Sequence, residues 1–213
     1  MDDSVQRKQI SAGKMYTYIR GYANGRKMSQ TLKALSFARE KHSGQKRKSG
    51  EPYIIHPLTM ACHALALGID DDETIATILL HDVCEDCGVV LSELPVGEEV
   101  RRAVDLITFR KMDDETDDAA IIRYYNMMLQ SKSATYAKLV DRCHNVSSMA
   151  GVFSVPKLKS YVEETRRFVL PLLKKAKLRW ADDTDALFVL KYHITSVIDA
   201  IDEAIRVLEA SGK

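Results

Sequence analysis

Apolar residues along this chain recur mostly at intervals of three and four, which is the spacing of one buried face of an α-helix. Alternating β-branched runs are scarce, and the chain contains only 5 prolines and 10 glycines. The pattern therefore predicts an all-α fold. We expect helices at about residues 29–42, 57–68, 70–82, 98–107, 115–130, 133–149, 156–179 and 183–210.

Residues that commonly begin and end helices support several of these boundaries. Ser29 is placed to N-cap the first of them. Pro57 and Gly68 fit the beginning and the end of the second, because proline is favoured in a first helical turn and glycine just past a last one. The acidic run Asp70–Glu73 would stabilise the N-terminus of the third, where the helix dipole favours negative charge.

The pattern divides the chain into three parts. Residues 1–28 are polar and interrupted by glycines, so we expect an N-terminal extension with one short helix, followed by a main helical domain over 29–150. Residues 151–213 are expected to be additional C-terminal helices packed on the same domain. The last helix has a heptad-like apolar stripe formed by Leu187, Leu190, Ile194, Val197, Ile201, Ala204 and Leu208. Such a stripe usually packs on the body of its own chain, and a homodimer contact is the alternative.

Composition narrows the class of protein. The formal net charge is +1, so the molecule as a whole has no electrostatic reason to bind nucleic acid or an anionic membrane. Most of the four cysteines lie in apolar, helix-like stretches, which is typical of free thiols in a reducing compartment. Neither a signal peptide nor an apolar run of about 20 residues is present. We therefore expect a cytoplasmic protein that binds any anionic ligand through a local cluster of charge.

The first candidate for chemistry is the run His81-Asp82-Val83-Cys84-Glu85-Asp86. On a continuous helix, Glu85 and Asp86 would lie three and four residues after Asp82, so the three carboxylates would share a face. These groups directly follow the apolar run ATILL, where charged side chains are costly to bury without a partner. A divalent cation is the natural partner.

A second cluster with the same spacing lies on a later helix and consists of Lys138, Asp141, Arg142, His144 and Asn145. A third polar marker, His56, comes just before a predicted helix start. One His-Asp pair alone is more often structural than catalytic, but three clusters on separate helices favour a metal site. Imidazole and carboxylate ligands suit manganese, iron, zinc or magnesium. Such an ion activates water and holds phosphate oxygens, and Glu85 or Asp86 would then serve as general base.

Three stretches of the sequence resemble a known family. They are HSGQKRKSGEPYIIHP at 42–57, HDVCED at 81–86 and KLVDRCHN at 138–145. In order and spacing they are similar to the HD-superfamily hydrolase domain of RelA/SpoT-type alarmone enzymes, across about residues 29–150. The resemblance implies an HD-domain helical bundle. The long family members also carry nucleotide-synthesising and regulatory domains, for which 213 residues leave no room, so we expect a small, hydrolase-only member.

The resemblance also implies roles for individual residues. It implies a divalent metal ion, commonly manganese, held by His56, His81, Asp82 and Asp141. Glu85 and Asp86 would be the catalytic acids that activate water. Arg47, Lys48 and Asn145 would contact the nucleotide, and Lys138 and Arg142 match basic positions that support the phosphates or the fold. The implied reaction is hydrolysis of the 3′-pyrophosphate of (p)ppGpp to GDP or GTP and pyrophosphate.

Two features depart from the family pattern. Ser147-Ser148 stands where bifunctional members usually carry a basic residue and a threonine, which removes a phosphate contact and leaves the exact nucleotide open. The stretch 109–118 is also unusually acidic for a site that receives a polyanion. Two alternatives therefore stay open: a phosphatase acting on another nucleotide such as NADPH, and an antitoxin-like protein that acts by binding a partner. His42, His63 and His193 have no carboxylate at helical spacing, and we expect them to be surface or hydrogen-bonded histidines.

Overall fold

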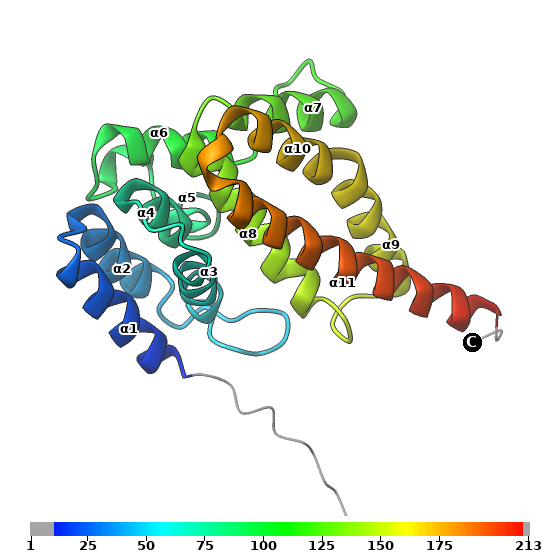
Figure 1. Cartoon of the computed structure of the whole chain (residues 1–213), viewed down its shortest axis with the longest axis horizontal. Coiled ribbons are helices and arrows are strands. Elements are labelled where there is room, and N and C mark those ends of the chain that lie inside the picture. The colour runs from blue at the N-terminus through cyan, green and yellow to red at the C-terminus, as the bar shows by residue number, and fades with distance from the viewer. Residues whose placement is uncertain (1–10, 211–213) are drawn as a thin grey trace, which may run out of the picture.

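The computed structural model describes residues 11–210, and its regular structure is helical throughout, as predicted (Figure 1). The longer helices are α1 (Ala12–Gly25), α2 (Ser29–Lys41), α3 (Ile55–Ala66), α4 (Asp72–Leu80), α6 (Glu98–Ile107), α7 (Asp117–Met128), α8 (Lys132–Ser148), α9 (Val155–Glu164), α10 (Leu170–Arg179) and α11 (Thr184–Ala210). Shorter turns are α5 (Val83–Asp86), η1 (Leu91–Glu93), η2 (Thr165–Val169) and η3 (Ala181–Asp183). Most predicted helices begin and end within two residues of these bounds.

Helix α4 lies at the centre of the fold. Every residue from Thr74 to Leu80 is buried, and the helix packs against α2, α3, α6 and α8. A helix that is apolar on all sides is stable only inside a protein, which explains the sequence IATILL. Helix α8 crosses the same core through Leu139, Val140 and Cys143. The two buried helices hold the candidate chemical groups at their ends and faces.

The structure corrects the predicted cap of α2. Ser29 is the first residue of the helix, and no side chain of its own N-cap residue caps it. The cap comes instead from the start of α4, where the Asp72 carboxylate accepts hydrogen bonds from the Gln30 N (2.9 Å) and Thr31 N (2.7 Å). Asp71 caps α4 itself through the Thr74 N, at 2.8 Å. The acidic run therefore joins two helices as well as stabilising one.

The predicted helix at 156–179 contains an irregular turn. A π-helical segment, η2, separates α9 from α10 and precedes Pro171. Proline has no backbone N–H and its ring crowds the carbonyl four residues earlier, so an α-helix cannot pass through it unchanged. Thr165, at the start of this turn, is fully buried and donates to the Tyr161 carbonyl at 2.6 Å.

Helix α11 packs on the rest of the chain, which confirms the intramolecular role expected for its stripe. Leu187, Leu190 and Ile194 are fully buried in the core that also contains α4 and α8. Further on, Ile198 and Ile205 are the buried positions, and the predicted Val197 and Ile201 are partly buried against the same core cluster as Ile198. Ala204 and Leu208 of the predicted stripe are exposed. Figure 1 shows α11 running across α8 and extending beyond the body at its C-terminal end.

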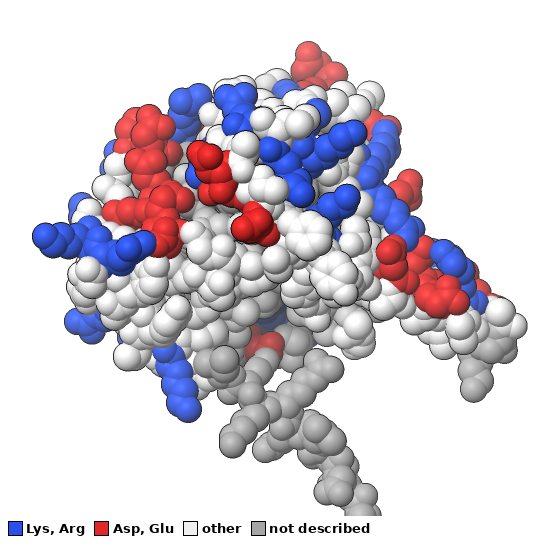
Figure 2. All heavy atoms as spheres, viewed as in Figure 1, with Lys and Arg blue, Asp and Glu red and all other residues white. Residues whose placement is uncertain are grey.

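The surface agrees with the nearly neutral composition. On the face shown in Figure 2, acidic side chains gather over α4 and α6 and basic side chains over α10. This mixture gives no field of one sign across that face, as expected for a chain of net charge +1. Within the described residues, no helix combines the length and apolarity that crossing a bilayer requires.

Candidate active site

The helical structure is interrupted between α4 and α5 at His81-Asp82. Helix α4 ends at Leu80 and α5 begins at Val83, so the run is not the single helix that the sequence argument assumed. On one helix, neighbouring side chains point about 100° apart. The break lets both point the same way, and the His81 Nε2 lies 2.8 Å from the Asp82 Oδ2. Asp86 still follows by one turn, since its N donates to the Asp82 carbonyl at 2.8 Å.

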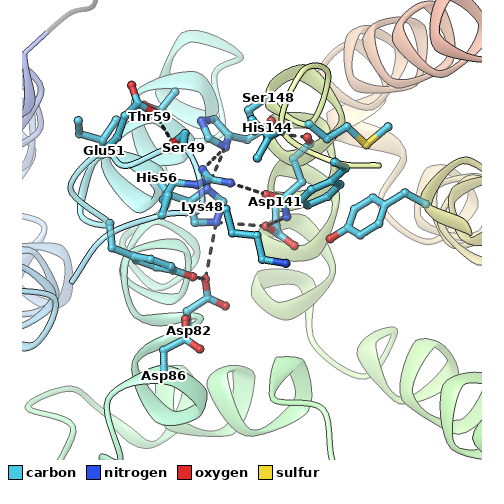
Figure 3. A pocket seen from close by; sticks show the side chains of 18 of the residues that line it. Lys48, Ser49, Glu51, His56, Thr59, Asp82, Asp86, Asp141, His144 and Ser148 are labelled. Atoms are coloured by element: carbon cyan, nitrogen blue, oxygen red, sulfur yellow. Dashed lines mark hydrogen bonds and ion pairs between the residues drawn. The ribbon is translucent and has the colours of Figure 1, made fainter. Parts of the chain in front are cut away.

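Four predicted metal ligands converge from three segments. His56 comes from α3 and Asp141 from α8, and Figure 3 shows their side chains and that of Asp82 directed toward one centre. The His56 Nε2 lies 3.2 Å from the His81 Nε2 and 3.6 Å from the Asp82 Oδ2. The Asp141 Oδ1 lies 3.3 Å from the His56 Nε2 and 3.8 Å from the His81 Nε2. Neighbouring ligands of an octahedral ion are about 3 Å apart. The ligand atoms of His56, His81 and Asp82 lie within 4.8 Å of one another and could hold one divalent cation, with the Asp141 Oδ1 beside the two imidazoles.

Hydrogen bonds at the Nδ1 atoms of His81 and His56 leave their Nε2 atoms directed toward the metal centre. The His81 Nδ1 lies 2.9 Å from the Ile78 carbonyl, which can only accept, so its Nε2 faces the centre. The His144 Nδ1 lies 3.1 Å from the Arg47 Nη1 and 2.9 Å from the His56 Nδ1. Because arginine can only donate, His144 accepts at Nδ1, and His56 must donate from its Nδ1. His56 therefore keeps an unprotonated Nε2, as a metal ligand requires.

Burial and neighbouring charges shift the pKa values of several groups at the centre. Burial disfavours a charged His81, yet the adjacent Asp82 carboxylate raises the pKa of His81 to about 9. Burial also opposes ionisation of Asp141, but Lys138 and His56 hold the pKa of that carboxyl well below its usual range. Burial, followed by the neighbouring His56 and Arg47 side chains, lowers the pKa of His144 to about 3. In the absence of a metal, a protonated His81 supplies the positive charge that the two aspartates need.

The predicted catalytic carboxylates flank this centre. Glu85 and Asp86 both line the cavity that contains the metal-ligand candidates. The Glu85 Oε1 accepts from the Phe109 N at 2.5 Å, which fixes one oxygen, and partial burial raises the pKa of this carboxyl. A raised carboxyl pKa suits a group that must exchange protons near neutral pH.

The cavity has a volume of about 640 Å³, which is the size of a small-molecule site. Its walls include all but two of the predicted site residues: Arg47, Lys48, His56, Asp82, Glu85, Asp86, Lys138, Asp141 and Asn145. His81 lines an adjoining cavity of about 260 Å³, which shares Asp82, Glu85, Lys138 and Asp141 with the first. Among the lining residues of the larger cavity, carboxylates outnumber lysines and arginines.

Several predicted nucleotide contacts are joined to the metal centre. The Arg47 Nη2 donates to the Asn145 Oδ1 at 3.1 Å, and the Asn145 Nδ2 donates to the Asp141 Oδ1 at 2.7 Å. Lys48 lies at the cavity wall with its Nζ 5.3 Å from the centre of the Phe153 ring. The Lys138 Nζ lies 3.3 Å from the Asp141 Oδ2. The basic loop before α3 and the middle of α8 therefore face each other across the site.

Arg142 is placed differently. It is 2% exposed and lines neither of these two cavities. Its guanidinium donates to the Glu164 Oε1 at 2.5 Å and to the Thr165 Oγ1 at 3.1 Å, which joins α8 to the turn between α9 and α10. Of the two roles considered for Arg142, these contacts match support of the fold.

Two residues that contact the ligand candidates, His144 and Tyr53, had no predicted role of their own. His144 was seen only as a member of its cluster, and its contact with His56 depends on a pairing across 88 residues. Tyr53 lies inside one of the matching stretches, and its hydroxyl donates to the Asp82 Oδ2 at 2.5 Å. The sequence signal for the contact between Tyr53 and Asp82 was the position of this tyrosine, three residues before His56.

The two departures from the family pattern also have defined positions. Ser148 lines the larger cavity, whereas Ser147 lies outside it with its Oγ 3.0 Å from the His193 Nε2. The acidic side chains of 109–118 line neither cavity. Within that stretch, Glu115 pairs with Arg123 at 2.6 Å. The acidic loop is therefore not an obstacle to an anion in the site.

Comparisons with known proteins relate the chain to HD-domain proteins. Residues 34–108 match the HD domain family. The chain is 38% identical over 146 residues to the guanosine-3′,5′-bis(diphosphate) 3′-pyrophosphohydrolase of Aquifex aeolicus (strain VF5), covering 66% of this chain and 20% of that protein. It is 36% identical over 144 residues to the protein of the same name from Vibrio cholerae serotype O1, covering 63% of this chain and 20% of that protein. A probable GTP pyrophosphokinase of Mycobacterium leprae is 32% identical over 164 residues, covering 72% of this chain and 20% of that protein.

The chain thus spans about one fifth of the length of these relatives. A solved structure described by the words "A metazoan ortholog of SpoT hydrolyzes ppGpp and plays a role in starvation responses" has the same fold, with a TM-score of 0.61 at 19% identity. That match covers 80% of this chain and 94% of the other. Residues 34–108 are therefore similar to the HD domain, and over about two thirds of its length the chain is related in sequence to bacterial guanosine-3′,5′-bis(diphosphate) 3′-pyrophosphohydrolases and GTP pyrophosphokinases.

Proposed function

We propose that this protein is a divalent-metal-dependent hydrolase that removes the 3′-pyrophosphate of (p)ppGpp to give GDP or GTP and pyrophosphate. The observation that carries the proposal is the convergence of ligand atoms from His81, Asp82 and Asp141 within 3.6 Å of the His56 Nε2, beside a cavity that Arg47 and Lys48 also line. The names of the relatives from Aquifex aeolicus and Vibrio cholerae support the substrate.

HD-domain hydrolases use a divalent metal ion, and the charge of this cavity agrees with that requirement. Because carboxylates outnumber basic side chains along its wall, a polyanionic nucleotide would be repelled without an added cation. We assign Mn²⁺ to this role, since two imidazoles and two carboxylates with open positions for oxygen suit it. When bound, the ion would supply Lewis-acid activation of water and of a phosphate oxygen.

The side chains of the cavity account for the other steps. Arg47 and Lys48 would bind the phosphates, and the apolar wall that contains Phe153 would take the base. Glu85 would accept a proton from water as the water oxygen bonds to the phosphorus next to O3′. The bond between that phosphorus and O3′ then breaks, and the ribose oxygen receives a proton, with Asp86 as the second carboxyl available to transfer it.

A substrate panel tests the proposal. The purified protein with Mn²⁺ would be offered ppGpp, pppGpp, NADPH and simple nucleotides, beside Asp82→Ala and, as a matched control, Asp113→Ala in the exposed loop. We expect pyrophosphate from ppGpp with the wild type and the control, and loss of turnover in Asp82→Ala. Phosphate from NADPH alone would support the other phosphatase, and no turnover together with capture of a protein partner would support the antitoxin-like alternative.

Two further predictions belong to this proposal. We place the enzyme in the cytoplasm, since all four cysteines are free thiols.

A homodimer through α11 would use the outer face of this helix, where Phe188 is 59% and Tyr192 68% exposed, because the inner face packs on the chain itself. Light scattering after size-exclusion chromatography measures that state, and a monomer at all concentrations would contradict it.

A further inference from the structure

A second group of metal-binding side chains lies outside the active site. His63 on α3, Cys143 on α8 and His193 on α11 each offer one ligand atom, and these atoms all lie within 4.8 Å of one another. The two imidazole rings are 5.6 Å apart, centre to centre, at an interplanar angle of 55°. Cys143 is fully buried and the two histidines are partly buried, so one side of the group is closed and the other reaches solvent.

We propose that His63, Cys143 and His193 form a zinc site that joins α11 to α3 and α8. A thiolate with two imidazoles is a ligand set that zinc prefers, and carboxylates are absent from it. The hydrolytic centre has the opposite character, since its candidates are imidazoles and carboxylates without a thiol. The two sites therefore differ in the ions they select and share no residue.

The spacing is close to what zinc needs. Tetrahedral zinc holds sulfur at about 2.3 Å and nitrogen at about 2.0–2.1 Å, which places neighbouring ligand atoms about 3.3–3.8 Å apart. The ligand atoms lie within 4.8 Å of one another and must therefore move about 1 Å closer to bind zinc. Rotation of the two partly buried imidazoles can supply that movement. The solvent side leaves a fourth position for water.

The hydrogen bonds of Ser147 determine that the Nε2 of His193 carries a hydrogen. The Ser147 hydroxyl donates its only hydrogen to the Cys143 carbonyl at 2.7 Å. Its oxygen, 3.0 Å from the His193 Nε2, must then accept from that nitrogen. In the tautomer with hydrogen on Nε2, the lone pair that a metal ligand needs lies on the His193 Nδ1. Burial and the neighbouring His193 also lower the pKa of His63, which keeps that imidazole neutral at pH 7.

Cobalt is the probe that separates this site from the hydrolytic one. The full-length protein, reduced and freed of metal, would first receive Mn²⁺ and then one equivalent of Co²⁺. A cobalt–thiolate bond gives a charge-transfer absorption in the near ultraviolet, which a site of imidazoles and carboxylates does not give. We expect this absorption in the wild type, its loss in Cys143→Ala, and at least about tenfold weaker cobalt binding in His193→Gln.

Matched controls cover the other thiols. Cys62 adjoins His63 in sequence, and the Cys87 Sγ lies 3.4 Å from the His42 Nδ1. Cys62→Ala and Cys87→Ala should both keep the absorption. Circular dichroism would check the fold of each variant, and Zn²⁺ should raise the Tm of the wild type but not that of His193→Gln. No absorption in the wild type, or one that persists in Cys143→Ala, would overturn the proposal.

Discussion

His144 is predicted to set the metal affinity of the active site without being a ligand itself. Its Nδ1 accepts from the His56 Nδ1 at 2.9 Å, and His56 is 1% exposed. His144→Phe keeps a ring in place but removes the acceptor. The His56 N–H would then be buried without a partner, which costs about 1–3 kcal/mol, and the imidazole would no longer be held with Nε2 toward the centre.

The expected effect is a 10- to 100-fold weaker binding of Mn²⁺, which is the usual range when the partner of a ligating histidine is lost. That range corresponds to about 1.4–2.7 kcal/mol. Free Mn²⁺ can be measured directly by electron paramagnetic resonance as the protein is titrated. Activity on ppGpp should recover in large part at saturating Mn²⁺, because no ligand has been removed.

Arg47→Gln is the matched control, since Arg47 contacts the same His144 nitrogen but does not touch His56. This variant should leave Mn²⁺ affinity unchanged and raise the KM for the nucleotide about 10-fold or more, through loss of a charged phosphate contact. Equal Mn²⁺ affinity in His144→Phe and the wild type would refute the hydrogen-bond argument. A weakened Mn²⁺ affinity in Arg47→Gln would also refute it.

Three further predictions follow from other contacts. Glu164→Gln leaves the buried Arg142 without its anionic partner and should lower the unfolding free energy by about 2 kcal/mol in urea melts at pH 7, a figure reduced because the Glu164 side chain is 35% exposed. Burial opposes ionisation of Glu164, but Arg142 outweighs it and lowers the pKa of this carboxyl in the folded state. The difference in unfolding free energy should therefore shrink as the pH falls below about 4.5. Tyr53→Phe removes the donor to Asp82 and should lower kcat/KM about 10-fold at unchanged Tm, and an unchanged kcat/KM would contradict that role. Because His81 has a raised pKa of about 9 and must lose its proton to bind metal, Mn²⁺ affinity should rise about 10-fold per pH unit between about pH 7 and 9, and a flat profile in calorimetry would contradict it.

Local rules were sufficient for most of the fold. Apolar periodicity placed α6, α8 and α11 within one or two residues. Gly68 follows the end of α3 as predicted, whereas the helix begins at Ile55, two residues before the predicted start at Pro57. The cap of α2 could not be found in this way, because the carboxylate that supplies it belongs to Asp72, more than 40 residues later. The break at His81-Asp82 had no signal either, since neither glycine nor proline marks it.

The candidate site shows the same division between local and long-range information. Spacing alone placed Asp141 and Asn145 on one face of a helix, and in the structure they are joined by a hydrogen bond of 2.7 Å. The contacts of His144 with His56, and of His193 with His63, connect different helices, so no spacing within one helix could reveal them. Arg142 belongs to the same cluster in sequence but does not line the site. Its position in the sequence could not predict that its buried guanidinium points toward Glu164.

The products formed from ppGpp test the central claim most directly. Phosphorus NMR of the wild-type reaction with Mn²⁺ should show GDP and pyrophosphate in equal amounts, with no orthophosphate. Asp141→Asn, checked for its fold by circular dichroism, should form neither product. Orthophosphate as the first product, or no turnover by a folded wild type that binds Mn²⁺, would contradict the assignment of a 3′-pyrophosphohydrolase.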